Sequence, residues 1–571
     1  MAESPVDMNL VDVPADRAAL YRKHGWWLPE MLDDLVLRHC AVQPDRCAVV
    51  SGERRLSYAE LASAVDRAAR RLGRIGIRAG ERVLVQLPND VEFLVLVLGL
   101  VRLGAAPVLA MPALREHELR HVLSVTRPVA MAVPRSFQRF DHLAMAQRLL
   151  EGCSSVRLLL VSDGDAAGHV DLSRLCFGRD FEGEVEDFPP PGAAREGNRA
   201  VTDNAVYLLS SGTTGPSKAI PRTHEAFGHV IRSSAAVSGL SARSVYLALM
   251  PVTHSFVFAH PGILGTLAAG GRVVFAMSED PAHVFSLVEG EAVTHVALVP
   301  ALAAQWLSVA RAAGGGAAGT RAARALSSLR VMQVGGARLD AGTAQGLQRV
   351  LGCRVQQVYG MSEGLLHFTR LDDADEVVTR TQGRPASPGD EVLVVDEDGE
   401  LVAPGVVGEL ITRGPSVIAG YYGDPEANRR AFTGAGYYRT GDLVRLHPSG
   451  NYVVAGRTKD VINRGGEKIA ADELEELVLQ HPQVHGAAAV AMPHRLYGEA
   501  VCLYVVPAGA ERPRLHEIRG FLEGRGLARF KLPARVELVD ALPMVGVGKV
   551  DKVLLRKQIA DRVAAERTAR A

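Results

Sequence analysis

The chain has 571 residues, which at about 150 residues per domain corresponds to roughly three or four structural units. Lys plus Arg and Asp plus Glu each number 64, and no basic stripe stands out, which argues against nucleic acid or an anionic membrane as the main partner. The six cysteines are scattered without a CxxC pair, which favours free thiols in a reducing cytoplasm over a disulfide framework or a zinc site.

The first part of the chain alternates predicted strands and helices. Its N-terminal stretch lacks the basic region and apolar core of a signal peptide. Ser57 with Glu60 three residues later forms a capping box that predicts an amphipathic helix. A buried strand is expected at 82–88 and a helix at 90–103, whose apolar run FLVLVLGLV is too short to span a bilayer. With a further strand at 205–210, this alternation predicts an α/β body with mixed sheets.

After about residue 455 the pattern changes. A charged turn at 456–469 precedes a predicted helix at 472–480, strands at 485–492 and 499–506, a helix near 514–525 and a strand at 534–539. This β-α-β-β-α-β order is typical of a small ferredoxin-like α+β unit. We therefore expect a large N-terminal body of several subdomains over residues 1–456 and a C-terminal lid over residues 457–571.

Residues 210–218, SSGTTGPSK, follow the predicted strand directly. A loop of small residues exposes backbone N–H groups and hydroxyls, and Lys218 adds a positive charge, which is chemistry suited to polyphosphate. It is not a Walker A loop, because the lysine follows Ser217 and precedes Ala219. On its composition alone, the stretch also suits an ordinary surface loop.

This stretch resembles the phosphate loop of the adenylate-forming superfamily, which includes acyl-CoA synthetases, luciferases and nonribosomal-peptide adenylation domains. Further blocks follow in that family's order: QVGGARL (333–339), VYGMSEG (358–364), GELITRGPSVIAGYY (408–422), YRTGDLVR (438–445), GRTKDVINRGGEKI (456–469) and GVGKVDK (546–552). HGWW near the start, GLLHFTRLDD (364–373) and INRGGEKIAADELE resemble the stand-alone aryl-acid AMP ligases, which activate 2,3-dihydroxybenzoate or salicylate.

The resemblance implies two half-reactions with ATP and Mg²⁺ as cofactors. An aryl carboxylate and ATP give aryl-AMP and pyrophosphate, and the phosphopantetheine thiol of an aryl carrier protein then takes the acyl group and releases AMP. An aryl- or acyl-CoA ligase that uses free CoA is one alternative, and a catalytically silent nucleotide-binding module is another. We expect a cytoplasmic monomer or homodimer with no nucleic-acid or membrane partner.

The resemblance also implies the residues of the site. Lys549 would reach from the lid to bridge the carboxylate and the α-phosphate, a role for which a compact charge on a long stem is suited. His254 and Glu363 complete the catalytic set, with Glu363 as the magnesium ligand, Lys459 as the hinge, and Gly465 and Gly466 along the passage for the thiol. The expected ATP-binding residues are Ser210, Ser211, Gly212, Thr213, Thr214, Gly215, Lys218, Gly335, Gly336, Ala337, Tyr359, Gly360, Met361, Ser362, Asp442 and Arg457.

The expected aryl-acid pocket departs from the dihydroxybenzoate ligases. It comprises His254, Ser255, Phe256, His260 and Gly335. Ser255 stands where those ligases carry Asn, Phe256 replaces Tyr, and His260 replaces Ser or Cys. Because pockets discriminate by pairing buried polar groups, we expect another aryl acid, such as an amino- or hydroxy-substituted benzoate or a pyridine carboxylate. The alternative is a compensated pocket that still accepts salicylate or dihydroxybenzoate.

Overall fold

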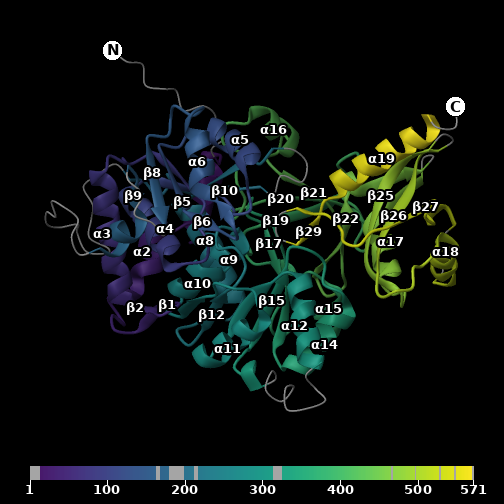
Figure 1. The fold of residues 1–571 in the computed structure, drawn as a ribbon, viewed down its shortest axis with the longest axis horizontal. Coiled ribbons are helices and arrows are strands. Elements are labelled where there is room, and N and C mark those ends of the chain that lie inside the picture. The colour runs from purple at the N-terminus through teal and green to yellow at the C-terminus, as the bar shows by residue number, and fades with distance from the viewer. Residues whose placement is uncertain are drawn as a thin grey trace.

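The computed structural model describes residues 13–162, 168–178, 199–210, 216–312, 324–464, 467–494, 497–525, 527, 529–545 and 548–568. Within them, two large sheets and a smaller one form the body, and a separate sheet forms the C-terminal unit at one end of the molecule (Figure 1). The predicted fold class is therefore confirmed. Among the helices in these ranges, none is both long enough and apolar enough to cross a membrane.

The two large sheets are parallel in their centres, as expected where strands alternate with helices. The first has the order β18 (Arg384–Pro385), β17 (Leu366–Phe368), β16 (Arg354–Gly360), β15 (Val331–Gly335), β14 (His295–Leu298), β12 (Val245–Ala248), β13 (Arg272–Phe275), β1 (Cys47–Ser51) and β2 (Arg54–Ser57). The second has the order β11 (Ala219–Thr223), β10 (Asn204–Leu209), β4 (Ala106–Leu109), β3 (Arg82–Val85), β5 (Ala130–Pro134), β8 (Leu158–Ser162) and β9 (Val170–Asp171). Antiparallel strands close some of the edges, including β10–β11 beside the glycine-rich loop.

Helices cover these sheets and join them through one large apolar core. The helix predicted after Ser57 is α3 (Tyr58–Arg74), and its capping box is present. The helix α4 (Val91–Leu103) is buried on every side, which explains its continuous apolar run. The other described helices of the body are α1 (Ala15–Lys23), α2 (Leu32–Leu37), α5 (Glu116–Thr126), α6 (His142–Leu150), α7 (Leu172–Phe177), α8 (His224–Val237), α9 (Ser255–Ala259), α10 (Gly262–Ala268), α11 (Pro281–Glu291), α12 (Pro300–Ala312), α14 (Ala341–Leu351), α15 (Asp375–Arg380) and α16 (Pro425–Ala431).

The smaller sheet of the body is antiparallel and lies where the body meets the C-terminal unit (Figure 1). Its order is β19 (Glu391–Val395), β20 (Gly408–Arg413), β21 (Tyr438–Leu446) and β22 (Tyr452–Arg457). The short helical turn η3 (Thr458–Asp460) follows β22 directly and leads into the C-terminal unit. The expected division at residues 456 and 457 falls at the last residue of β22 and stays a prediction.

The C-terminal unit contains the predicted β-α-β-β-α-β order, preceded by one further strand. Its elements are β23 (Val461–Arg464), β24 (Glu467–Ala470), α17 (Ala471–Val478), β25 (Val484–His494), β26 (Gly498–Pro507), α18 (Leu515–Gly524) and β27 (Arg535–Leu538). After them come the hairpin of β28 (Met544–Val545) and β29 (Lys549–Val550), and α19 (Lys552–Thr568), which packs on β25 and is shown in yellow in Figure 1. The unit has apolar cores of its own.

Candidate active site

Lys549 lies on β29, at the end of the C-terminal unit that touches the body. The preceding Gly548 has a φ of +73°, and a Cβ added there would lie 2.9 Å from the Val299 side chain. Only glycine suits this backbone conformation and this close approach. Burial lowers the pKa of Lys549, and its ammonium also interacts with charged side chains outside the C-terminal sheet, Arg457, Asp442 and Glu363. The structure therefore places Lys549 near residues that the sequence analysis assigned to the same nucleotide site.

Asp442 is held from two sides. Tyr359 donates a hydrogen bond from Oη to Asp442 Oδ2 at 2.7 Å, and Arg457 Nε lies 2.9 Å from Asp442 Oδ1. Asp442 and Arg457 are cross-strand neighbours in the β21–β22 pair, which sets this geometry. Asp442 is buried, so the strand pair fixes a carboxylate next to an aromatic ring. That arrangement can bind the ribose and base of a nucleotide together.

Glu363 occupies the tight turn between β16 and β17. Its carboxylate accepts a hydrogen bond from Tyr421 Oη at 2.8 Å, and Tyr421 Oη lies 3.1 Å from Tyr438 Oη. Lys218 Nζ lies 4.7 Å from the centroid of the Tyr421 ring, a cation–π contact. One tyrosine therefore connects the candidate metal ligand with the lysine of the glycine-rich loop.

The ends of the glycine-rich loop are joined by backbone pairing. Ser210 N donates to Lys218 O at 3.0 Å, and Lys218 N donates to Ser210 Oγ at 2.9 Å. These bonds extend the β10–β11 hairpin up to the mouth of the loop. The other expected members of the loop, Ser211, Gly212, Thr213, Thr214 and Gly215, lie outside the described residues.

The expected aryl-acid pocket lies at the start of α9. His254 caps this short helix, since its Nδ1 accepts a hydrogen bond from Phe256 N at 3.2 Å. Burial, and after it the Lys549 ammonium, lowers the pKa of His254 to about 4, so the imidazole is neutral at pH 7. Ser255 Oγ lies 3.0 Å from Ser362 Oγ, which ties the pocket to the Glu363 turn. The Phe256 ring packs over Gly335, where an added Cβ would lie 3.2 Å from ring carbons.

His260 is buried behind these residues. Its Nε2 has no hydrogen-bond partner among the described residues. Burial holds its pKa well below the usual value, and the positive charge of Arg222 acts in the same direction. A buried ring nitrogen without a partner costs about 1–3 kcal/mol, so His260 leaves a polar atom that a ligand can satisfy.

The remaining predicted nucleotide residues lie around the ends of β15 and β16. Gly336 adopts a φ of +86° and is exposed with Ala337 just after β15. Gly360 ends β16, where an added Cβ would lie 2.5 Å from Leu366, and Met361 is half-buried beyond it. Because these positions leave the backbone accessible next to Tyr359, they can accommodate a flat base.

Lys459, the expected hinge, lies in η3. Its backbone carbonyl accepts a hydrogen bond from Arg556 Nη1 at 3.3 Å, and the same nitrogen lies 2.8 Å from Asp460 Oδ1. Burial lowers the pKa of Lys459, and the surrounding cations Lys218, Arg457 and Arg430 add to the effect. A polyphosphate bound among these cations would offset their mutual repulsion. Gly465 and Gly466, the expected thiol passage, lie outside the described residues.

An ion pair that the sequence analysis did not predict joins the body to the C-terminal unit. Arg338, directly after Ala337, makes two hydrogen bonds of 2.7 and 3.1 Å to Glu476 on α17. The arginine and glutamate side chains are 35% and 52% exposed. The pair therefore contributes to the contact between the body and the C-terminal unit in the pose that the structure shows.

We expect Arg338→Glu to slow the ATP-dependent first step about two- to fivefold, because an exposed ion pair contributes at most about 1 kcal/mol. The charge-swapped double variant Arg338→Glu/Glu476→Arg should recover most of the loss in steady-state assays. Glu566→Arg breaks the pair of Arg535 and Glu566, which lies wholly inside the C-terminal unit, and serves as the matched control. Equal rates for the single variant and the control would show that the Arg338 pair has no such role.

Several contributors were missed by sequence reasoning. Tyr421 and Arg338 lie inside motif blocks, but nothing in their immediate sequence shows that they contact Glu363 and Glu476. Arg222 follows the glycine-rich loop, and the sequence analysis gave no signal for it. The HGWW segment, residues 24–27, packs against the body, because Trp27 Nε1 donates a hydrogen bond to Pro415 O at 2.9 Å.

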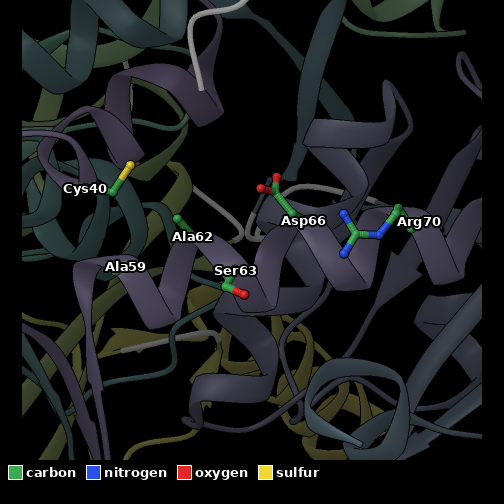
Figure 2. Close-up of a pocket in the computed structure, with 6 residues that line it drawn as sticks. All are labelled: Cys40, Ala59, Ala62, Ser63, Asp66 and Arg70. Carbon is green, nitrogen blue, oxygen red and sulfur yellow. The ribbon is translucent and has the colours of Figure 1, made fainter. Parts of the chain in front are cut away.

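A surface pocket between the N-terminal turn at Cys40 and helix α3 lies apart from these residues (Figure 2). Burial and the nearby Asp66 carboxylate raise the pKa of the Cys40 thiol, so this cysteine is a poor nucleophile at neutral pH. Asp66 itself is paired with Arg102 Nε at 2.7 Å. All six cysteines are free thiols, as expected.

Comparison with known proteins gives matches along most of the chain. Residues 36–422 match the family described as AMP-binding enzyme, and residues 473–549 match the AMP-binding enzyme C-terminal domain. The chain is 42% identical over 552 residues to the 2,3-dihydroxybenzoate-AMP ligase of Bacillus subtilis (strain 168), covering 97% of this chain and 98% of that protein. It is 45% identical over 563 residues to the salicylyl-CoA synthase / salicylate adenylyltransferase of Streptomyces sp, covering 98% and 99%. The apo structure of MbtA from Mycobacterium smegmatis matches with a TM-score of 0.70 and 40% identity, covering 96% and 98%.

Proposed function

We propose, from the premise that the chain belongs to the AMP-binding enzyme family, that it activates an aryl carboxylic acid with ATP and transfers the aroyl group to a thiol. In the first step a carboxylate oxygen attacks the α-phosphorus of ATP, and pyrophosphate leaves. In the second, a thiol sulfur attacks the carbonyl carbon and loses its proton, AMP leaves, and a thioester remains. The observation that carries the proposal is the position of half-buried Lys549, whose ammonium interacts electrostatically with Asp442, Arg457 and Glu363.

Two anions must meet in the first step, so neutralising their repulsion lowers the barrier. The Lys549 ammonium would lie between the carboxylate and the α-phosphate, where a preorganised charge stabilises the transition state. Asp442 would accept the ribose hydroxyls while Tyr359 stacks on the base, and their hydrogen bond fixes both. Lys218 and the backbone of the glycine-rich loop would bind the departing phosphates.

The residues present fit a magnesium ion that is held mainly by the nucleotide. Within the described part of the chain, no group of three or more His, Cys, Asp or Glu side chains converges on one point. Glu363 supplies one buried carboxylate, and magnesium commonly binds one or two carboxylates together with substrate phosphates and water. When bound, the ion would neutralise charge on the phosphates.

We propose that the substrate is a substituted benzoate or a pyridine carboxylate. Neutral His254 would lie next to the carboxylate, and Phe256 with Gly335 would form an apolar slot for the ring. Ser255 is already engaged by Ser362, whereas His260 Nε2 has no hydrogen-bond partner within the part of the chain that the structure describes. A ring substituent or ring nitrogen that pairs with His260 would therefore be favoured.

Pyrophosphate exchange across a panel of aryl acids tests this proposal. We expect exchange with aryl acids only, and the highest kcat/KM with an amino- or hydroxy-substituted benzoate or a pyridine carboxylate rather than 2,3-dihydroxybenzoate. A maximum at 2,3-dihydroxybenzoate would contradict the interpretation of Ser255 and His260 while leaving the reaction class intact. Absence of exchange with every acid would contradict the function itself and favour a silent nucleotide-binding module.

The proposed acceptor is the phosphopantetheine thiol of an aryl carrier protein, with free CoA as the alternative. The C-terminal unit would rotate about Lys459 after pyrophosphate leaves, and the thiol would then pass Gly465 and Gly466. Loss of the polyphosphate would leave the cations around Lys459 unshielded, which favours this movement. Parallel assays with CoA and with a pantetheinylated carrier protein distinguish the two acceptors.

A further inference from the structure

Arg222 lies on β11, just after the glycine-rich loop, and its side chain is 1% exposed. Its Nη1 donates to the backbone carbonyl of Glu363 at 3.1 Å, and its Nη2 donates to the backbone carbonyl of Ser416 at 2.8 Å. The three residues are far apart in sequence. One guanidinium thus joins the loop-bearing strand to the Glu363 turn and to the segment before Tyr421.

The contact between these segments is tight. Gly364 has a φ of +125°, and a Cβ added there would lie 1.7 Å from Ser416 O and 2.7 Å from Arg222 Nη1. Glu363 O also accepts a hydrogen bond from Ile418 N at 2.8 Å. The turn that carries Glu363 therefore contacts the Arg222 guanidinium directly. A small shift of the guanidinium would move this turn.

The charge of Arg222 is compensated only at a distance, by the carboxylates of Asp390 and Glu363. Within the described residues it forms no ion pair with a carboxylate, and its Nε has no hydrogen-bond partner. Burial lowers the pKa of Arg222 to about 10, so it remains protonated at neutral pH. A buried charge with so little compensation destabilises a fold, which argues for a role at the site.

We propose that Arg222 is a positioning residue for the ATP-dependent step. Its two N–H groups fix the main chain of Glu363 and of Ser416, and the Tyr421 hydroxyl then orients the Glu363 carboxylate toward the nucleotide phosphates and their magnesium. Arg222 itself touches no reacting atom. This inference rests on the proposed function, since it assigns the task of Glu363 to a nucleotide–metal site.

The chain contains a matched control. Arg71 on α3 is 2% exposed, and its guanidinium also donates to backbone carbonyls, those of Arg174 at 2.8 Å, Leu175 at 3.0 Å and Gly178 at 2.8 Å. None of these contacts involves a predicted site residue. A lysine at either position keeps the charge but loses the planar fork that holds two carbonyls at once. Both substitutions should therefore lower the melting temperature, whereas only one should affect the site.

The experiment compares Arg222→Lys, Arg71→Lys, Glu363→Gln and the double variant Arg222→Lys/Glu363→Gln. We expect Arg222→Lys to lower kcat of pyrophosphate exchange about 10- to 100-fold, since charge-assisted hydrogen bonds to the turn are lost. Arg71→Lys should keep the wild-type rate. The double variant should be no slower than Glu363→Gln alone, because Arg222 acts through Glu363.

A second readout needs no aryl acid. ATP with Mg²⁺ should raise the melting temperature of the wild type and of Arg71→Lys, and raise that of Arg222→Lys less. Additive losses in the double variant, or equal behaviour of the two arginine variants in both assays, would overturn the proposal. If the wild type exchanges pyrophosphate with no acid, the proposed function fails, and the melting shift alone decides the role of Arg222.

Discussion

Lys549→Ala is expected to lower the rate of aryl-AMP formation about 10²- to 10³-fold, with the protein still folded. The ammonium is the cation that the C-terminal unit delivers to the site, and a preorganised charge of this kind contributes about 2.7–4 kcal/mol to transition-state stabilisation. Because the substitution removes a half-buried charge from an otherwise intact hairpin, the melting temperature should not fall. Pyrophosphate exchange and thermal unfolding measure the two effects.

Lys557→Ala provides the control for this variant. Lys557 is an exposed lysine of α19 in the same unit, and its loss should change neither the rate nor the stability. If Lys549→Ala retains more than about a tenth of the wild-type rate, which corresponds to less than about 1.4 kcal/mol of barrier, Lys549 is not the bridging charge.

Asp442→Ala is expected to lower kcat/KM for ATP about 100-fold, mainly through KM, while KM for the aryl acid changes little. The carboxylate would bind the ribose through charge-assisted hydrogen bonds, each of which contributes about 1.5–3 kcal/mol. The substitution also removes the partner of Tyr359 Oη and one side of the Arg457 pair. Exchange assays at varied ATP and varied acid separate the two constants.

Asp442→Asn tests whether the charge of this side chain or its shape matters more for ATP binding. The amide keeps the volume and one acceptor oxygen, so the ring of Tyr359 should remain in place while the ribose contacts weaken. A variant with intermediate KM for ATP fits this account. An unchanged KM for ATP in both variants would place the ribose elsewhere.

Capping residues and hydrophobic patterns predicted the helices and strands well, because helix and strand formation depends largely on residues close together in the sequence. The capping box at Ser57 and Glu60 is present at the start of α3, and the apolar run after Asp90 is the buried helix α4. The order of the C-terminal unit followed from periodicity, apart from its first strand and the terminal helix α19. The predicted strand at 82–88 ends earlier, at Val85; Gln86 N still donates to Ala132 O at 2.9 Å, but Pro88 has no N–H with which to extend the ladder.

The residues of the candidate site were predicted by motif position, but the hydrogen bonds between them were not. The hydrogen bonds from Tyr359 to Asp442 and from Tyr421 to Glu363 join residues 83 and 58 positions apart. Arg222 and Glu363 are separated by 141 positions. Such contacts depend on how strands of different sheets meet, and neither periodicity nor capping carries that information. The departures at Ser255 and His260 could be located in the sequence, whereas their hydrogen-bonding states required the structure.

We propose that Lys549 acts in the first step, in which the carboxylate and the α-phosphate are joined, and not in the second step, in which the thioester forms. Supplying preformed aryl-AMP to Lys549→Ala, together with the thiol acceptor, isolates the second step, in which no second anion attacks the phosphate. We predict that thioester forms at close to the wild-type rate although the same variant makes aryl-AMP from ATP about 10²- to 10³-fold more slowly than the wild type. Loss of both steps to the same extent, in a variant that melts like the wild type, would contradict the account.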